Sequence, residues 1–279
     1  ERNRATRWID LGSMNFQPSE MAKLTVIIAL AAYGTHFRVR MRELKYGLLL
    51  PGGVLAVLLF LIYKEPDYST MALLAATSGI ILMISGANWR HAIPVALMGF
   101  LLFAYKILSS PMRMERIRVW LNPEYDKLDK GYQIDQGILA MGNGGLLGVG
   151  LGNGQQKNGF VPEPHTDMIF TMIGEELGVV VTLLVVVALV VIFICGLYIS
   201  WKSGDRFGQL LGCGITFLIC LQAFINIGVV TRLLPNTGIP LPFISYGGSS
   251  LVFMMASLGL LLSIANHSTE SINADNFDD

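Results

Sequence analysis

Seven long apolar stretches dominate the sequence and restrict it to one class of fold. A helix needs about 20 mostly apolar residues to cross the hydrocarbon core of a bilayer. With 53% hydrophobic and only 14% charged residues, the chain is too apolar to cover a water-facing surface of its own. We therefore predict an all-α fold, a polytopic helical bundle over residues 1–265 with seven transmembrane helices, at 18–35, 46–63, 69–86, 92–108, 168–200, 208–230 and 242–265.

Basic residues in the short loops predict the orientation of the bundle. The opposite short loops carry only Lys64 and Arg232, and short cytoplasmic loops are the ones enriched in Lys and Arg. The long polar loop at about 109–167 is then external, and the acidic tail 266–279 is cytoplasmic and disordered. The loops predicted to be cytoplasmic carry Arg38, Arg40, Arg42, Lys45, Arg90, Lys202 and Arg206.

The overall charge gives no indication of a nucleic-acid partner. Lys and Arg total 20, Asp and Glu total 20, and the net charge is zero. We expect the partner to be membrane lipid and no nucleic acid to bind.

The segment PEPHTDMIF, 162–170, places Asp167 where a polar, proline-broken run meets an apolar one. Thr166 is predicted to cap the helix that starts here, with Asp167 in its first turn. A carboxylate there is stabilised by the helix dipole by about 0.3–1 kcal/mol. Position alone favours this structural role over a catalytic one.

Glu175 and Glu176 follow within the same apolar stretch. A carboxylate at the centre of a bilayer costs about 2.5–3.5 kcal/mol on insertion scales. These two side chains must therefore face the bundle interior, water or a basic partner. A structural hydrogen-bonding role and a functional role both remain open for them.

The run GNGGLLGVGLGNG, 142–154, is rich in glycine but fits neither GxGxxG nor a P-loop. Its backbone N–H groups could approach a diphosphate. The alternative is a tightly turned loop packed at the membrane surface. The residues do not separate these two interpretations.

Other polar and aromatic groups gather at the predicted outer helix ends. Glu20 and Lys23 are one turn apart and are predicted to pair. Trp120 suits the headgroup zone, either as an anchor or as a wall for an amphiphilic substrate. The proline- and glycine-rich segment 232–250 predicts an irregular, re-entrant path into the last helix. Together these groups favour an externally open site for an amphiphile.

Five motifs in order resemble those of the SEDS family (shape, elongation, division and sporulation), which includes RodA, FtsW and SpoVE proteins. The resemblance covers 8–265 and implies ten transmembrane helices, of which the first three are absent from this chain. The chain also opens without an initiator Met. The motifs are WIDLGSMNFQPSEMAKL, EPDYST, YQIDQGILAMGNGGLLGVGLGNG, VPEPHTDMIFTMIGEELG and LPNTGIPLPFISYGGSS.

The resemblance implies a peptidoglycan glycosyltransferase that polymerises lipid II on the outer face, paired with a class B penicillin-binding protein. It places the family's essential aspartate at Asp167, with the role of general base, and so reverses the preference for a structural role. Undecaprenyl diphosphate leaves and the configuration inverts. The leaving diphosphate is expected to be stabilised by a basic residue, with Arg7, Arg116, Arg118 and Lys157 as candidates, or by a divalent cation, Mg or Mn.

The remaining substrate-binding candidates flank Asp167 or lie in the other motifs. Two alternatives are a lipid II flippase, in which Glu175 and Glu176 would carry protons, and a non-catalytic scaffold for a transpeptidase. Some division-type members have a lysine in an LLPTKG-like stretch, where this chain has Asn236, Thr237 and Gly238. The substrate-binding candidates are His165, Thr166, Glu163, Gln133, Gln136, Trp120, Tyr246 and Ser249, together with Arg7 and Lys157.

Overall fold

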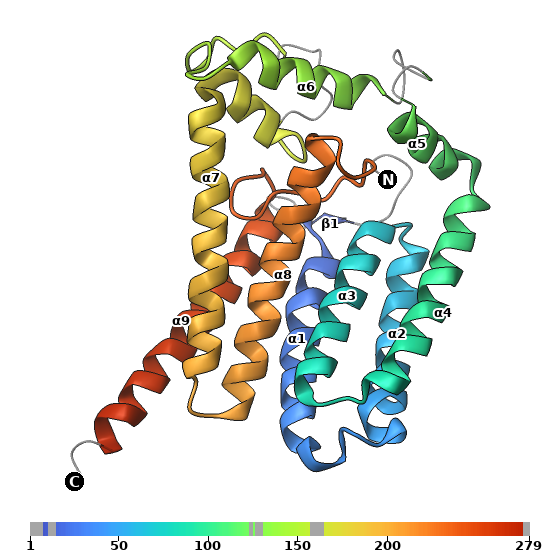
Figure 1. Ribbon diagram of the computed structural model, residues 1–279, viewed down its shortest axis with the longest axis vertical. Coiled ribbons are helices and arrows are strands. Elements are labelled where there is room, and N and C mark those ends of the chain that lie inside the picture. The colour runs from blue at the N-terminus through green and yellow to red at the C-terminus, as the bar shows by residue number, and fades with distance from the viewer. Residues whose placement is uncertain (1–7, 11–14, 123–124, 126–130, 157–164, 276–279) are drawn as a thin grey trace. The chain divides into compact units, whose positions relative to one another are not determined.

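The computed structural model describes residues 8–10, 15–122, 125, 131–156 and 165–275, and the chain folds as two compact units (Figure 1). The first unit consists of Glu1–Val95, Val191–Leu221 and Gly248–Asp279, and the second of Ala96–Val190 and Gln222–Gly247.

Helices account for almost all regular structure in the described residues. They are α1 (Pro18–His36), α2 (Leu50–Lys64), α3 (Tyr68–Ser85), α4 (Trp89–Leu108), α5 (Pro111–Leu121), α6 (Tyr132–Gly144), α7 (Ile169–Lys202), α8 (Arg206–Val230) and α9 (Gly248–Asp275). A 3₁₀ turn at Arg38–Arg40 and a π turn at Lys45–Leu49 join α1 to α2. The short strands β1 (Ile9–Asp10) and β2 (Asn15–Phe16) pair antiparallel.

Every predicted apolar stretch contains a helix, which confirms the all-α membrane fold. Six helical segments are long and apolar enough to cross a membrane within the described residues, and α1 is not among them. Glu20 and Lys23 lower the hydropathy of α1. The seventh span therefore stays a prediction.

Two boundaries at the C-terminal end differ from the predictions. The last helix was predicted from 242 but begins at Gly248, because the proline-rich segment before it does not continue a helix. It was predicted to end at 265, yet α9 continues to Asp275, so helix replaces the predicted disorder over 266–275.

The predicted external loop contains two helices that the sequence analysis did not identify, α5 and α6. On α6, residues three or four apart form one buried face, which packs against the start of α7 (Figure 1). A Cβ added to Gly137 would lie 3.1 Å from Thr171, which shows how closely the two helices approach. That face consists of Ile134, Gly137, Ala140 and Gly144.

Within the first unit, α1, α3 and α8 pack through small residues. Gly34 of α1 faces Ser85 of α3, and Gly214 of α8 faces Ile27 and Ile81. Small residues allow helix backbones to approach closely in a membrane.

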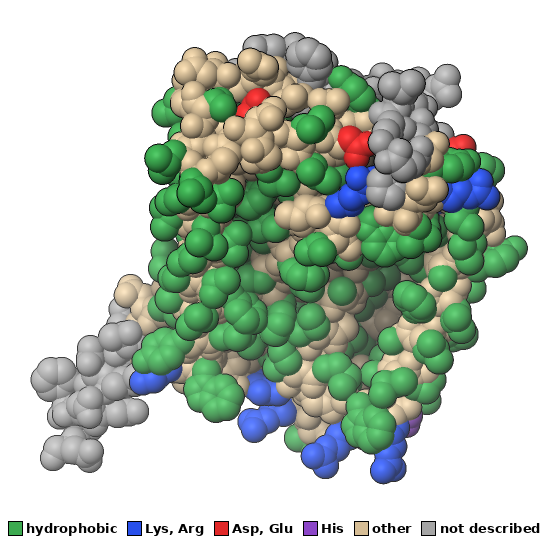
Figure 2. Space-filling model, turned by 45° about the horizontal axis from the view of Figure 1, so that its top comes forward, with side chains coloured by type: hydrophobic (Ala, Val, Ile, Leu, Met, Phe, Trp, Pro, Cys, Tyr) green, Lys and Arg blue, Asp and Glu red, His purple; other side chains and the backbone are tan. Residues whose placement is uncertain are grey.

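The basic loops of the first unit lie at one end of its helices. Figure 2 shows Lys and Arg side chains gathered there. Arg206 donates to the carbonyl of Ile84 at 2.6 Å, and Met41 is fully buried beside the turn at Gly86. This clustering is what the positive-inside rule requires of loops that share a membrane side.

The longest helix, α7, is broken at Gly178, whose φ of 80° and ψ of −178° are not helical. The glycine-rich run supplies the missing hydrogen bonds. The carbonyls of Glu175 and Glu176 accept from the N–H groups of Val149 and Gly150, both at 3.0 Å. The N–H groups of Val179 and Val180 donate to the carbonyls of Gly145 and Leu146 at 2.9 and 3.3 Å. The break is thus satisfied on both sides.

We expect Gly148→Ala to destabilise the protein by about 2–4 kcal/mol, because Gly148 has a left-handed φ of 78° and a Cβ there would overlap the carbonyl of Glu176. Thermal unfolding of the purified protein in detergent measures this. Gly142→Ala is the matched control, since a Cβ at this α6 position meets nothing within 4 Å and should stabilise the helix by about 0.5–1 kcal/mol. Equal midpoints for the two variants would contradict the described packing.

Candidate functional site

Asp167 lies in a turn, His165–Met168, directly before α7. The predicted position in the first helical turn is therefore wrong, since α7 begins at Ile169. Met168 and Phe170 are buried in the apolar core of the second unit, and this packing holds the turn in place. Asp167 itself is partly exposed.

Three successive backbone carbonyls of this turn are each held by a separate donor. The carbonyl of His165 accepts from the N–H of Tyr246 at 2.8 Å, and that of Thr166 accepts from the Ser245 hydroxyl at 2.6 Å. The carbonyl of Asp167 accepts from Asn226 Nδ2 at 2.8 Å. The backbone position of the carboxylate is consequently set by α8 and by the segment 231–247.

The Asp167 carboxylate faces the same irregular segment. The Thr166 hydroxyl donates to Asp167 Oδ1 at 3.1 Å. On the other side, a Cβ added to Gly238 would lie 3.6 Å from Oδ2. Gly238 has a φ of 68°, so the chain turns there without a side chain above the carboxylate.

An ion pair joins α6 to the start of the irregular segment. Arg232 contacts Asp135 at 2.7 Å and donates to the carbonyl of Val119 at 3.3 Å. Trp120 donates its indole N–H to the carbonyl of Arg232 at 3.0 Å. Arg232 has a φ of 62°, an uncommon conformation for a residue with a side chain. The contacts on both sides hold it in this conformation.

Glu175 and Glu176 have structural partners in the glycine-rich run. Glu175 is 1% exposed, and its carboxylate accepts from the backbone N–H groups of Gln155 at 2.9 Å and Gln156 at 3.3 Å. Glu176 accepts from the N–H of Gly152 at 3.0 Å. The anions bound by these loop amides belong to the chain itself, which favours the packed-loop interpretation over a diphosphate site.

Several predicted site residues lie together in the second unit. His165 and Tyr246 are exposed, and Gln133 accepts from Asn236 at 3.3 Å. Gln136 is partly exposed on α6, and the Trp120 indole donates to the carbonyl of Arg232. Arg116 donates to the carbonyl of Asn236 at 3.4 Å, while Arg118 is exposed on α5.

Other predicted residues belong to the first unit or lie outside the described residues. Ser249 belongs to the first unit, where its hydroxyl accepts from the N–H of Gln17 at 3.2 Å. Glu20 and Lys23, in the same unit, form the predicted pair at 2.9 Å and are almost fully buried. Arg7, Lys157 and Glu163 lie outside the described residues.

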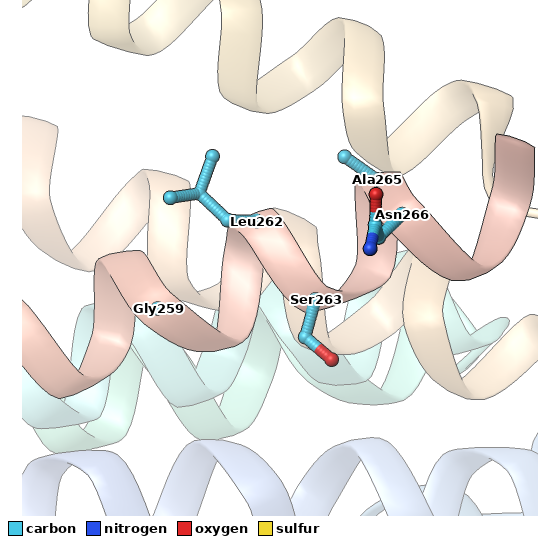
Figure 3. Close-up of a pocket in the computed structure, with 5 residues that line it drawn as sticks. All are labelled: Gly259, Leu262, Ser263, Ala265 and Asn266. Carbon is cyan, nitrogen blue, oxygen red and sulfur yellow. The ribbon is translucent and has the colours of Figure 1, made fainter.

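The described ranges contain no group of three His, Cys, Asp or Glu side chains that could hold a metal ion. The expected divalent cation stays a prediction, and no chemical step is assigned to it. A hollow beside α9 is lined by Gly259, Leu262, Ser263, Ala265 and Asn266 (Figure 3). All five residues belong to the first unit and none is a candidate.

The model of the cell cycle protein family that contains FtsW, RodA and SpoVE matches residues 1–270. The chain belongs to this family. Stage V sporulation protein E of Bacillus subtilis is 38% identical over 96% of this chain and 73% of that protein. A probable peptidoglycan glycosyltransferase FtsW of Geobacter sulfurreducens is 37% identical over 94% and 70%.

Solved structures of the family have the same fold. A structure of a peptidoglycan synthase complex, described as coordinating polymerization and crosslinking, matches with a TM-score of 0.78 at 26% identity, over 96% of this chain and 75% of that chain. The crystal structure of Thermus thermophilus RodA matches with a TM-score of 0.68 at 25% identity, over 95% and 71%. This family member is a multi-pass bacterial membrane protein. The three upstream helices remain a prediction.

Asn226 and Ser245 are the residues that sequence reasoning missed. Asn226 is 1% exposed and also donates to the carbonyl of Ile239 at 2.7 Å. Its neighbour one turn earlier, Gln222, donates to the carbonyl of Pro240 at 3.1 Å. The sequence did contain a signal for this role, namely two side-chain amides one turn apart in an apolar helix. Buried polar groups in a membrane need hydrogen-bond partners, so such a pair indicates contacts to another segment.

We expect Asn226→Asp to destabilise the protein by about 2–6 kcal/mol, because the buried carbonyl of Ile239 and the partly buried carbonyl of Asp167 lose their donor and face a carboxylate instead. Asn153→Asp is the matched control. The Asn153 amide is exposed and makes one 3.3 Å hydrogen bond to Val149, so its loss should cost less than about 0.5 kcal/mol. Thermal unfolding of both variants measures the difference. An Asn226→Asp protein as stable as the unaltered one would show that Asn226 does not hold the two segments together.

Replacements of Arg232 test the strained backbone separately from the ion pair. Arg232→Gly and Arg232→Ala both remove the guanidinium, but only alanine keeps a Cβ in the left-handed conformation. The glycine variant should be more stable by about 1 kcal/mol. The same two changes at Arg118, inside α5, should give the opposite order, because glycine weakens a helix. Alanine being the more stable at both positions would refute the strain.

Proposed function

We propose that the protein is a peptidoglycan glycosyltransferase that polymerises lipid II into glycan strands on the outer face of the cytoplasmic membrane. The observation that carries the proposal is the turn at Asp167. Its backbone is fixed by three donors while its carboxylate stays partly exposed. The names of the FtsW relatives support the same activity.

Asp167 acts as the general base. It takes the proton from the 4-hydroxyl of the acceptor sugar as that oxygen attacks the anomeric carbon of the growing chain. The bond to the diphosphate breaks, undecaprenyl diphosphate leaves with the electron pair, and the configuration inverts. A base must be held at hydrogen-bonding distance from the proton it removes. The fixed turn supports this role, because only the side-chain torsions of Asp167 then remain to be set.

Arg116 and Arg118 are the described candidates for stabilising the leaving diphosphate. Both lie on α5, and Arg116 reaches the carbonyl of Asn236, two residues before Gly238. Negative charge develops on the diphosphate as the glycosidic bond breaks, and a guanidinium placed in advance lowers that barrier. Arg7 and Lys157 remain candidates from the sequence.

The flippase alternative depends on Glu175 and Glu176 as proton carriers. Their carboxylates accept hydrogen bonds from loop amides, and this structural role argues against the flippase alternative. A class B penicillin-binding protein is the proposed partner, in line with the peptidoglycan synthase complex to which the fold is similar. In this arrangement the chain polymerises and the partner crosslinks.

Asp167→Asn should reduce polymerisation of purified lipid II by about 10²–10⁴-fold, because the amide cannot accept the proton. The assay uses the purified full-length protein in lipid, with thermal unfolding as the test of folding. Asp205→Asn is the matched control, since Asp205 caps α8 by accepting from Gly208 at 3.0 Å and asparagine caps equally well. A folded Asp167→Asn protein with normal activity would remove Asp167 from the mechanism.

A further inference from the structure

The glycine-rich run presents three strongly exposed leucines. Leu146, Leu147 and Leu151 are 72%, 82% and 77% exposed. We call residues 145–152 the leucine loop. The hydrogen bonds across the break in α7 hold its backbone in place, so the loop is a fixed feature of the second unit. Large aliphatic side chains fixed in an exposed position require an explanation.

Counting residues along α7 indicates that the loop is near the edge of the hydrocarbon core. Tyr198 and Trp201, near the end of α7, are exposed aromatic residues of the kind that mark a membrane interface. Counting back about 20 residues, the length of one crossing, reaches the residues just after Gly178. The backbones of Val179 and Val180 pair with Gly145 and Leu146, so the loop is tied to α7 at this level.

The apolar surface of the loop continues that of the membrane span. Val179, Val180, Leu183 and Leu184 are each about half exposed, at 49%, 48%, 59% and 60%. A span with so much apolar exposure faces lipid over this length. Leu146 directly adjoins this apolar surface, because its carbonyl accepts a hydrogen bond from the N–H of Val180.

Part of the loop's backbone is already hydrogen-bonded within the protein. Unpaired N–H groups cost several kcal/mol in hydrocarbon and exclude ordinary loops from it. Here the N–H groups of Val149 and Gly150 bind the carbonyls of Glu175 and Glu176, and the N–H of Gly152 binds the Glu176 carboxylate. The glycines add no polar side chains.

We propose that the leucine loop inserts its side chains among the acyl chains of the outer leaflet and anchors the start of α7 at a fixed depth. The piece of α7 between the loop and the Asp167 turn, 169–177, is about 14 Å long. Anchoring would hold Asp167 within reach of a lipid-linked diphosphate at the headgroups. Only the choice of the outer leaflet rests on the proposed function. The insertion itself is argued from the exposed leucines and from the hydrogen bonds that tie the loop to α7.

Nitroxide labels measure the depth directly in the reconstituted full-length protein. Cys195, Cys213 and Cys220 are replaced by alanine, and single cysteines are introduced as Leu147→Cys, Leu184→Cys and Gln155→Cys. Leu184 stands for the lipid-facing span, and Gln155 is an exposed polar position near the loop. Power-saturation EPR compares collisions with oxygen, which concentrates in lipid, and with a water-soluble nickel chelate.

The label at 147 should follow the label at 184, with a several-fold higher oxygen-to-nickel ratio than the label at 155. A ratio equal to that at 155 places the loop in water and overturns the proposal. Shielding of the 147 label from both agents also overturns it, because protein then covers the loop. If the cysteine-free chain does not fold, Leu147→Trp in the native background and quenching by brominated lipids give the same comparison.

Loss of function is tested separately from insertion. Leu146→Asp combined with Leu147→Asp should lower polymerisation several-fold and lower the oxygen-to-nickel ratio of a label at Leu151. Leu146→Ala with Leu147→Ala is the matched control and should change both much less. If polymerisation is absent even in the unaltered protein while the label at 147 stays in lipid, the proposed function fails and the anchor stands.

Discussion

The site depends on one buried amide. Asn226 donates from the same nitrogen to the carbonyls of Asp167 and Ile239, at 2.8 and 2.7 Å. One side chain of α8 therefore holds two non-helical segments in register, the turn before α7 and the segment before α9. A non-helical turn leaves carbonyls without helical partners, and each buried one left unpaired costs about 1–3 kcal/mol. The donor from α8, together with Ser245 and the N–H of Tyr246, allows a carboxylate to be held outside a helix.

The break in α7 is a second solution to the same constraint. Irregular backbone near a membrane must be paired inside the protein. At Asp167 the pairing comes from side chains of distant segments, whereas at Gly178 it comes from the backbone of the glycine-rich run. Glu176 accepts from the N–H of Gly152 in this run and Glu175 from the N–H groups of the two residues after it, which explains two carboxylates inside an apolar stretch. The glycines, the break and the glutamates form one structural unit.

The sequence predicted those features that depend on a single segment. Apolar length located the helices of the bundle, and spacing along one helix predicted the pair Glu20–Lys23. The hydrogen-bond partners of Asn226, Ser245 and the glycine-rich run were not predictable, because each depends on which group a distant segment presents. The residues also favoured a helix-start role for Asp167, and only the family resemblance indicated catalysis. Local chemistry did not distinguish these roles, since a carboxylate beside a helix start serves either one.

A basic residue from another helix lies close to the departure at Asn236–Thr237. Some division-type family members carry a lysine in this stretch, and this chain has none there. Arg116 of α5 instead donates to the Asn236 carbonyl, and the Asn236 amide donates to Gln133 of α6. A guanidinium from another helix thus stands beside the position where the lysine would be. Because an electrostatic contribution depends on where the charge lies and not on which segment carries it, the loss of one basic residue need not remove positive charge from the site.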